Sequence, residues 1–137
     1  MKKFKIAFHF DNYDRGDNID AHVESYEDPV IRKAIVNGNK RVTRKHKIEI
    51  LFDYPLDEPA VLSFKKRGGF TVKDIFRAIY RGYKKIYREE DRAYKLMEDD
   101  LEMSGTPYGL WGHYLDQLVI EGVTQKKPGY FVMDIGS

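Results

Sequence analysis

With 137 residues, of which 42% are hydrophobic, the chain is long enough to bury a core of its own, and we expect residues 1–137 to form a single domain. The absence of cysteine excludes disulfide bonds, thiolate zinc sites and a cysteine nucleophile, while 24 basic against 22 acidic side chains leave a net charge of only +2, which identifies no partner. No window approaches the roughly 18 apolar residues of a membrane span, so we expect a soluble, cytoplasmic protein without a membrane partner.

The chain opens with the alternation of a strand that has one buried face. The apolar residues of this alternation are Phe4, Ile6, Phe8 and Phe10. We therefore predict a strand from Lys2 to Phe10, followed by an Asp-, Asn- and Gly-rich loop over residues 11–18. Further on, the spacing of apolar residues after Asp28 and Pro29 favours a short helix that stops at Gly38.

Two more alternating runs predict a long hairpin. In the first, from Lys40 to Phe52, the even positions are mainly apolar and His46 shares their parity. The second, from Ala60 to Lys65, follows a loop that contains two prolines.

The segment from Thr71 to Arg88 has the period of an amphipathic helix. Its apolar side carries Val72, Ile75, Phe76, Ile79, Tyr80, Tyr83, Ile86 and Tyr87, and its other side is basic. Thr71 and Asp74 are spaced to cap the first turn. The apolar phase continues beyond Arg88, but Glu90 would then face the core, and an unpaired buried carboxylate costs several kcal/mol. We therefore predict a break between Arg88 and Asp91 and a second helix that ends near Glu102.

Two final runs, Leu118 to Thr124 and Tyr130 to Ile135, predict a C-terminal β-hairpin, because the Pro-Gly pair between them is a strong turn signal. The connection covers residues 125–129. Together these elements predict an α+β fold, with a mainly antiparallel sheet of about five strands covered on one face by the long amphipathic helix.

The charges are divided along the chain. Residues 32–88 hold 16 basic and 5 acidic side chains, a net charge of +11. Residues 11–28 hold 7 acidic and 1 basic side chain, and residues 89–102 hold 7 acidic and 2 basic ones. Blocks of opposite sign favour association between copies, so we expect a homodimer.

The basic block also supplies a candidate surface for a nucleic acid or an acidic protein. Its predicted binding residues are Lys65, Lys66, Arg67, Lys73, Arg77, Arg81, Lys84, Lys85 and Arg88. Tyr80 and Tyr87, at the edge of the apolar side of the helix, could stack on unpaired bases. The alternative is that this stripe is only the solvated side of the helix, neutralised by Glu89–Glu102.

No spacing of residues defines a catalytic or metal site, and we assign no catalytic residue, cofactor or metal. His113 and Asp116 could form an acid/base pair in a cleft, but Tyr108, Trp111 and His113 fit better as an aromatic anchor for a corner or for a partner. The acidic run from Asp11 to Asp20 does not match a calcium-binding loop, which leaves an irregular cation site open. The two glycines at 68 and 69 precede a helix start and could cradle an anion.

The segments FTVKDIFRAIYRGYKKIY (residues 70–87) and GLWGHYLDQLVIEGV (residues 109–123) resemble the C-terminal half of small proteins of large DNA viruses that infect amoebae, of the Marseillevirus type. The resemblance implies a viral protein that is associated with the particle or with the host and acts in the host cytoplasm. It implies no site residue.

The sequence thus favours a non-enzymatic interaction protein that associates with itself. The first alternative is a nucleic-acid-binding accessory factor that uses the basic side of helix 71–88, and the second is a small hydrolase-like enzyme around His113.

Overall fold

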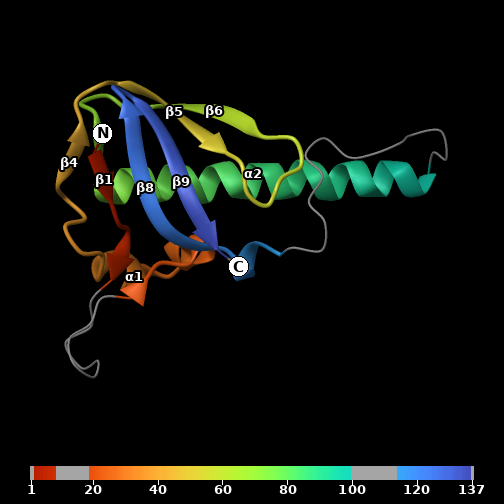
Figure 1. The fold of residues 1–137 in the computed structure, drawn as a ribbon. Coiled ribbons are helices and arrows are strands. Elements are labelled where there is room, and N and C mark those ends of the chain that lie inside the picture. Colours follow the sequence, from red (N-terminus) through yellow and green to blue (C-terminus); the bar gives the residue numbers. More distant parts are fainter. Residues whose placement is uncertain (1, 9–18, 100–113, 137) are drawn as a thin grey trace.

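Figure 1 shows a computed structural model of the chain, which describes residues 2–8, 19–99 and 114–136. It confirms the α+β class: a curved sheet lies over one long helix, α2 (Val72–Asp99), whose axis runs along its inner face. Five of the described strands form this sheet in the order β1 (Lys2–Phe4), β8 (Val119–Lys127), β9 (Tyr130–Gly136), β5 (Lys47–Phe52) and β6 (Ala60–Lys65). Neighbouring strands are antiparallel except β5 and β9, which are parallel.

Two small ribbons and three short helices complete the described structure. One ribbon pairs β2 (Ala7–Phe8) with β3 (Ile19–Asp20), and the other pairs β4 (Arg41–Thr43) with β7 (Phe70–Thr71). The 3-10 helix η2 (Val23–Glu27) leads into α1 (Pro29–Lys33), and η3 (Leu115–Gln117) leads into β8. The predicted short helix is therefore present, with Asp28 as its N-cap, but it ends at Lys33 rather than at Gly38.

Two predicted strands are each divided in the structure. The run from Lys2 to Phe10 breaks after Phe4: β1 joins the main sheet, whereas β2 pairs with β3. Ile6, Ala7 and Phe8 are all buried, so the simple alternation fails there, and Phe10 lies outside the described residues. The run from Lys40 to Phe52 breaks after Thr43 in the same way.

His46 lies in this second gap and is exposed, contrary to its predicted place on the buried parity. From Ile48 to Phe52 the predicted alternation is confirmed, and so is the hairpin with Ala60–Lys65, which pairs along its whole length. The C-terminal hairpin is confirmed as well. Its turn is tighter than predicted, because β8 extends to Lys127 and only Pro128 and Gly129 connect the strands, with Gly129 at a φ of 78°.

The predicted break in the long helix is wrong. α2 continues from Val72 to Asp99, and Glu90 lies inside it with only 2% of its surface exposed. The premise of the prediction was that a buried Glu90 would have no partner. In the fold it does have one, so the carboxylate can be buried without ending the helix.

The helix approaches the sheet most closely at Gly82. A Cβ atom at this position would lie 2.1 Å from Cζ of Phe52 on β5. The next residue, Tyr83, stacks edge-on against the same ring at 4.9 Å between centroids and donates a hydrogen bond of 2.6 Å to the carbonyl of Tyr54. Gly82 is therefore needed for contact between helix and sheet rather than for backbone freedom.

We expect Gly82→Ala to destabilise the protein, although the same change in an open helix stabilises it by about 1 kcal/mol. The methyl group would push Phe52 out of place, and overpacking of this kind lowers the free energy of unfolding by about 1–3 kcal/mol. Urea unfolding measures the effect. Phe52→Leu in the Gly82→Ala background should cost less than it does in the natural chain, because a smaller side chain leaves room for the methyl group; additive effects would contradict this contact.

Candidate functional site

Some of the predicted basic residues lie together beside β6, the edge strand of the sheet. A groove of about 340 Å³ lies between this strand and the first half of α2. It is lined by Ser63, Phe64, Lys65, Lys66, Phe70, Asp74, Arg77, Ala78 and Arg81. Four of the predicted binding residues thus share one groove that has a partly apolar floor.

The remaining predicted basic residues lie outside this lining. Arg67 is exposed in the turn after β6, Lys73 is half-buried in the first turn of α2, and Arg88 is exposed farther along the helix. Lys84 and Lys85 are exposed and ion-paired, at 3.5 Å to Glu27 and 3.7 Å to Glu89. Part of the basic stripe is therefore neutralised by the protein itself.

Arg77 and Arg81 are different. Both side chains are exposed, and within the part of the chain that the structure describes neither makes an ion pair. They are one turn apart on α2, so both cations point to the same side, over the groove. The acidic block from Glu89 onward begins two turns beyond Arg81, and it contributes no described ion pair to this arginine pair.

The strand beside them has an open edge. Lys66 donates its backbone N–H to the carbonyl of His46, 2.7 Å away, and the register pairs Phe64 with Ile48. Because backbone groups of an antiparallel strand point alternately to either side, the even-numbered residues of β6 bond to β5. The N–H and C=O groups of Val61, Ser63 and Lys65 therefore point away from the sheet, where no described strand pairs with them.

One carboxylate stands at the start of the groove. Asp74 accepts hydrogen bonds from the backbone N–H and the hydroxyl of Thr71, at 2.9 and 3.0 Å, and pairs with Nζ of Lys66 at 3.1 Å. Burial alone would raise the pKa of Asp74, but these hydrogen bonds and the lysine charge outweigh it and hold the pKa below its usual value. The predicted cap of Thr71 and Asp74 is thus confirmed, and it also fixes Lys66 in the groove.

The glycine pair before the helix does not form an anion site. The N–H of Val72 donates to the carbonyl of Lys40 at 3.0 Å, and that of Lys73 donates to the carbonyl of Gly38 at 2.9 Å. The N–H of Asp74 donates to Oγ1 of Thr71. The first amides of α2 are therefore occupied by the protein, which leaves no cradle of open donors for a phosphate.

The stacking role expected of two tyrosines does not fit their positions. Tyr80 is only 9% exposed: its ring packs against Tyr26, and its hydroxyl bonds to Glu27 and Lys84. The hydroxyl of Tyr87 is buried, and burial raises its pKa to about 12. Both rings pack against the hydrophobic core, so neither offers a free face to an unpaired base. Tyr108, Trp111 and His113 lie outside the described residues.

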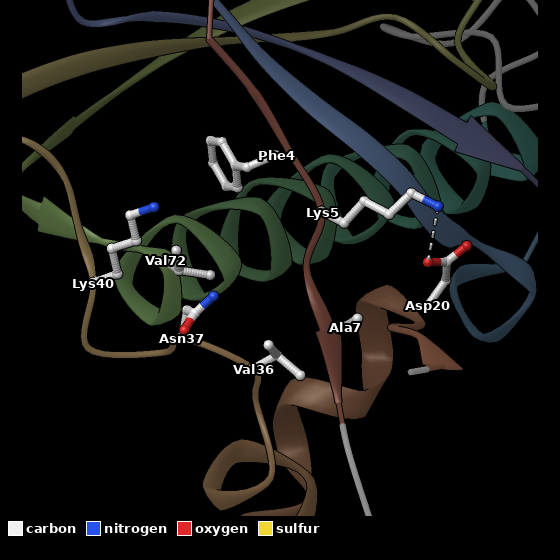
Figure 2. A pocket seen from close by; sticks show the side chains of 8 residues that line it. All are labelled: Phe4, Lys5, Ala7, Asp20, Val36, Asn37, Lys40 and Val72. Carbon is white, nitrogen blue, oxygen red and sulfur yellow. Dashed lines mark ion pairs between the residues drawn. The ribbon is translucent and has the colours of Figure 1, made fainter. Parts of the chain in front are cut away.

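A second hollow, of about 400 Å³, lies at the start of α2 (Figure 2). It is lined by Phe4, Lys5, Ala7, Asp20, Val36, Asn37, Lys40 and Val72. Figure 2 shows Lys5 reaching across to Asp20, and the two are 4.0 Å apart. Because Asp20 neutralises Lys5 within the hollow, its lining indicates the charge of a ligand less clearly than Arg77 and Arg81 do at the groove beside β6. Asp20 is the one described member of the acidic run 11–20.

Comparisons of the chain with protein-family models, with curated proteins and with solved structures find no match, so the viral resemblance stays a prediction. Over the residues that the structure describes, no helix is long and apolar enough to cross a membrane. The same residues contain no cluster of three His, Asp or Glu side chains that could hold a metal ion.

Asp74→Ala should lower the free energy of unfolding by about 1 kcal/mol at neutral pH, because it removes the cap of α2 and the partner of Lys66. A carboxylate whose folded pKa is depressed stabilises the protein fully above its unfolded pKa, here about 3.8, and less as the pH falls through the folded pKa. Urea titrations at several pH values should therefore show the two proteins converging under acid. Asp134→Ala removes an exposed ion pair with Lys3 and should change stability by less than about 0.5 kcal/mol.

Proposed function

We propose that this chain is a non-enzymatic interaction protein that binds an acidic, extended protein segment along β6 and the groove beneath it. The observation that carries the proposal is the juxtaposition of an open strand edge with two arginines that have no described counter-ion. We name the combination of the β6 edge, Arg77 and Arg81 the basic edge.

The spacing of the basic edge suits a strand rather than a helix as its ligand. Val61, Ser63 and Lys65 offer outward backbone groups to an added strand, as in other complexes formed by strand addition. Alternate side chains of such a strand are about 6.6–6.8 Å apart. Arg77 and Arg81 are separated by one helical turn, about 6 Å along the axis. Carboxylates at alternate positions of the ligand would therefore meet both guanidinium groups.

A nucleic acid is the less favoured ligand. The net charge of +11 over residues 32–88 would attract phosphates, but Lys84 and Lys85 are already paired and Tyr80 is buried. The surface therefore lacks the aromatic stacking that contributes about 1–3 kcal/mol per base to single-strand binding. An open strand edge adds nothing specific to recognition of a phosphate backbone.

A fluorescein-labelled peptide of alternating Glu and Val tests the proposal by fluorescence anisotropy at low and moderate salt. We expect binding that weakens with salt, and a Kd about tenfold or more higher for Arg77→Glu/Arg81→Glu, because two charge-assisted contacts are reversed. The matched control, Lys33→Glu/Lys126→Glu, has the same charge change at exposed sites away from the groove and should bind like the natural chain.

A labelled single-stranded oligonucleotide is the comparison ligand. The proposal is contradicted if the oligonucleotide binds more tightly than the peptide at equal salt, which would favour the accessory-factor alternative. It is equally contradicted if the peptide does not bind at low salt, or if both double variants weaken peptide binding to the same extent.

A further inference from the structure

We propose that a second copy of this chain pairs its own β6 with the open edge of β6, so that the two strands run antiparallel and join two sheets into one. The inference rests on the function proposed above, because it requires the same open strand edge to accept an added strand. Antiparallel pairing of one strand with itself is the arrangement that a two-fold axis produces.

The two edges of the sheet differ in how they are protected. β1, at one edge, is three residues long and includes Lys2 and Lys3, and short, lysine-rich edges resist the addition of another strand. β6, at the other edge, has six residues, and Val61 on it is 46% exposed. A longer edge strand with an exposed aliphatic side chain is the form that pairs with another strand.

The backbone restricts the register of the pair. Only the odd-numbered residues of β6 direct their N–H and C=O groups outward, so each must meet an odd-numbered residue of the second copy. With Leu62 on the two-fold axis, Val61 of each copy lies opposite Ser63 of the other. Pro59, which has no N–H to donate, then falls at the end of the pairing, a place where proline is tolerated in edge strands.

The charges at the two ends of β6 also favour antiparallel pairing. Asp57 and Glu58 precede β6, and Lys65, Lys66 and Arg67 end and follow it. Antiparallel pairing brings the acidic residues before β6 of each copy toward the basic residues at the end of β6 of the other, twice in each dimer. The acidic end of the strand is therefore complementary to its own basic end.

The groove between β6 and α2 stays open in this dimer. A two-fold axis perpendicular to the sheet leaves both copies of α2 on the same face, with Arg77 and Arg81 of each lining a shared cleft. Their repulsion is reduced because the side chains are exposed and the screening length in physiological salt is about 8 Å. An added strand-forming acidic peptide would compete with the second copy for β6 and should dissociate the dimer.

Sedimentation equilibrium across the micromolar range tests the pairing with charge reversals at the two ends of β6. Asp57→Lys/Glu58→Lys makes both ends basic, and Lys65→Glu/Arg67→Glu makes the second end mainly acidic. Each variant alone should dissociate about tenfold or more readily than the natural chain, because like charges then face each other. An equimolar mixture of the two variants should form a heterodimer, since each end again meets the opposite charge.

The mixture also controls for folding, because two misfolded variants would not restore a defined dimer, and far-ultraviolet circular dichroism of each variant should match that of the natural chain. Val61→Pro, which blocks an outward N–H, should give a monomer. A natural chain that is monomeric at high micromolar concentration overturns the inference, as does a dimer that both charge reversals leave intact. If that monomer still binds the Glu-Val peptide through Arg77 and Arg81, the proposed function stands and only the pairing of two copies is wrong.

Discussion

The arrangement of the molecule depends on the contact between Gly82 of α2 and the ring of Phe52 on β5. A glycine in the middle of a long helix is unfavourable by itself, by about 1 kcal/mol relative to alanine. Here it lets the helix backbone lie against an aromatic ring of the sheet, with Tyr83 packed on the same ring and bonded to the carbonyl of Tyr54. This contact fixes both the distance and the rotation of α2 over the sheet. Arg81, the preceding residue, and Arg77, one turn earlier, are turned toward β6 as a result.

Much of the fold could be predicted from local patterns. The hairpin of β5 and β6, the C-terminal hairpin and the cap formed by Thr71 and Asp74 all depend on residues close together in the sequence, where periodicity and turn chemistry are informative. The predictions failed where contacts between residues far apart in the sequence determine the structure. β1 ends at Phe4 because its partner is β8, more than a hundred residues away. Glu90 is tolerated in the helix because it has a partner in the fold, which the pattern of apolar residues does not reveal.

The candidate site shows the same division. Its basic residues can be read from the sequence, but which of them are already ion-paired within the protein cannot. Lys84 pairs with Glu27, 57 positions earlier, and Lys66 is held by Asp74, whereas Arg77 and Arg81 make no ion pair with any described residue. The edge position of β6 was equally hidden, since alternation identifies a strand without giving its neighbours. The parallel pairing of β5 with β9 places β6 at the edge of the sheet. Parallel strands are not joined by a tight turn, so no turn motif in the sequence indicates such a pair.

That parallel pairing also bears on how the protein forms. β9 lies in the centre of the sheet, between β8 and β5, yet it is the last of the described strands to leave the ribosome. Until it emerges, the hairpin of β5 and β6 has two free edges, and the apolar side of α2 lacks most of the sheet that covers it. Contacts between such distant segments form slowly. A nascent chain that still lacks β9 therefore exposes apolar surface that the complete sheet covers, and surface of this kind is prone to aggregation.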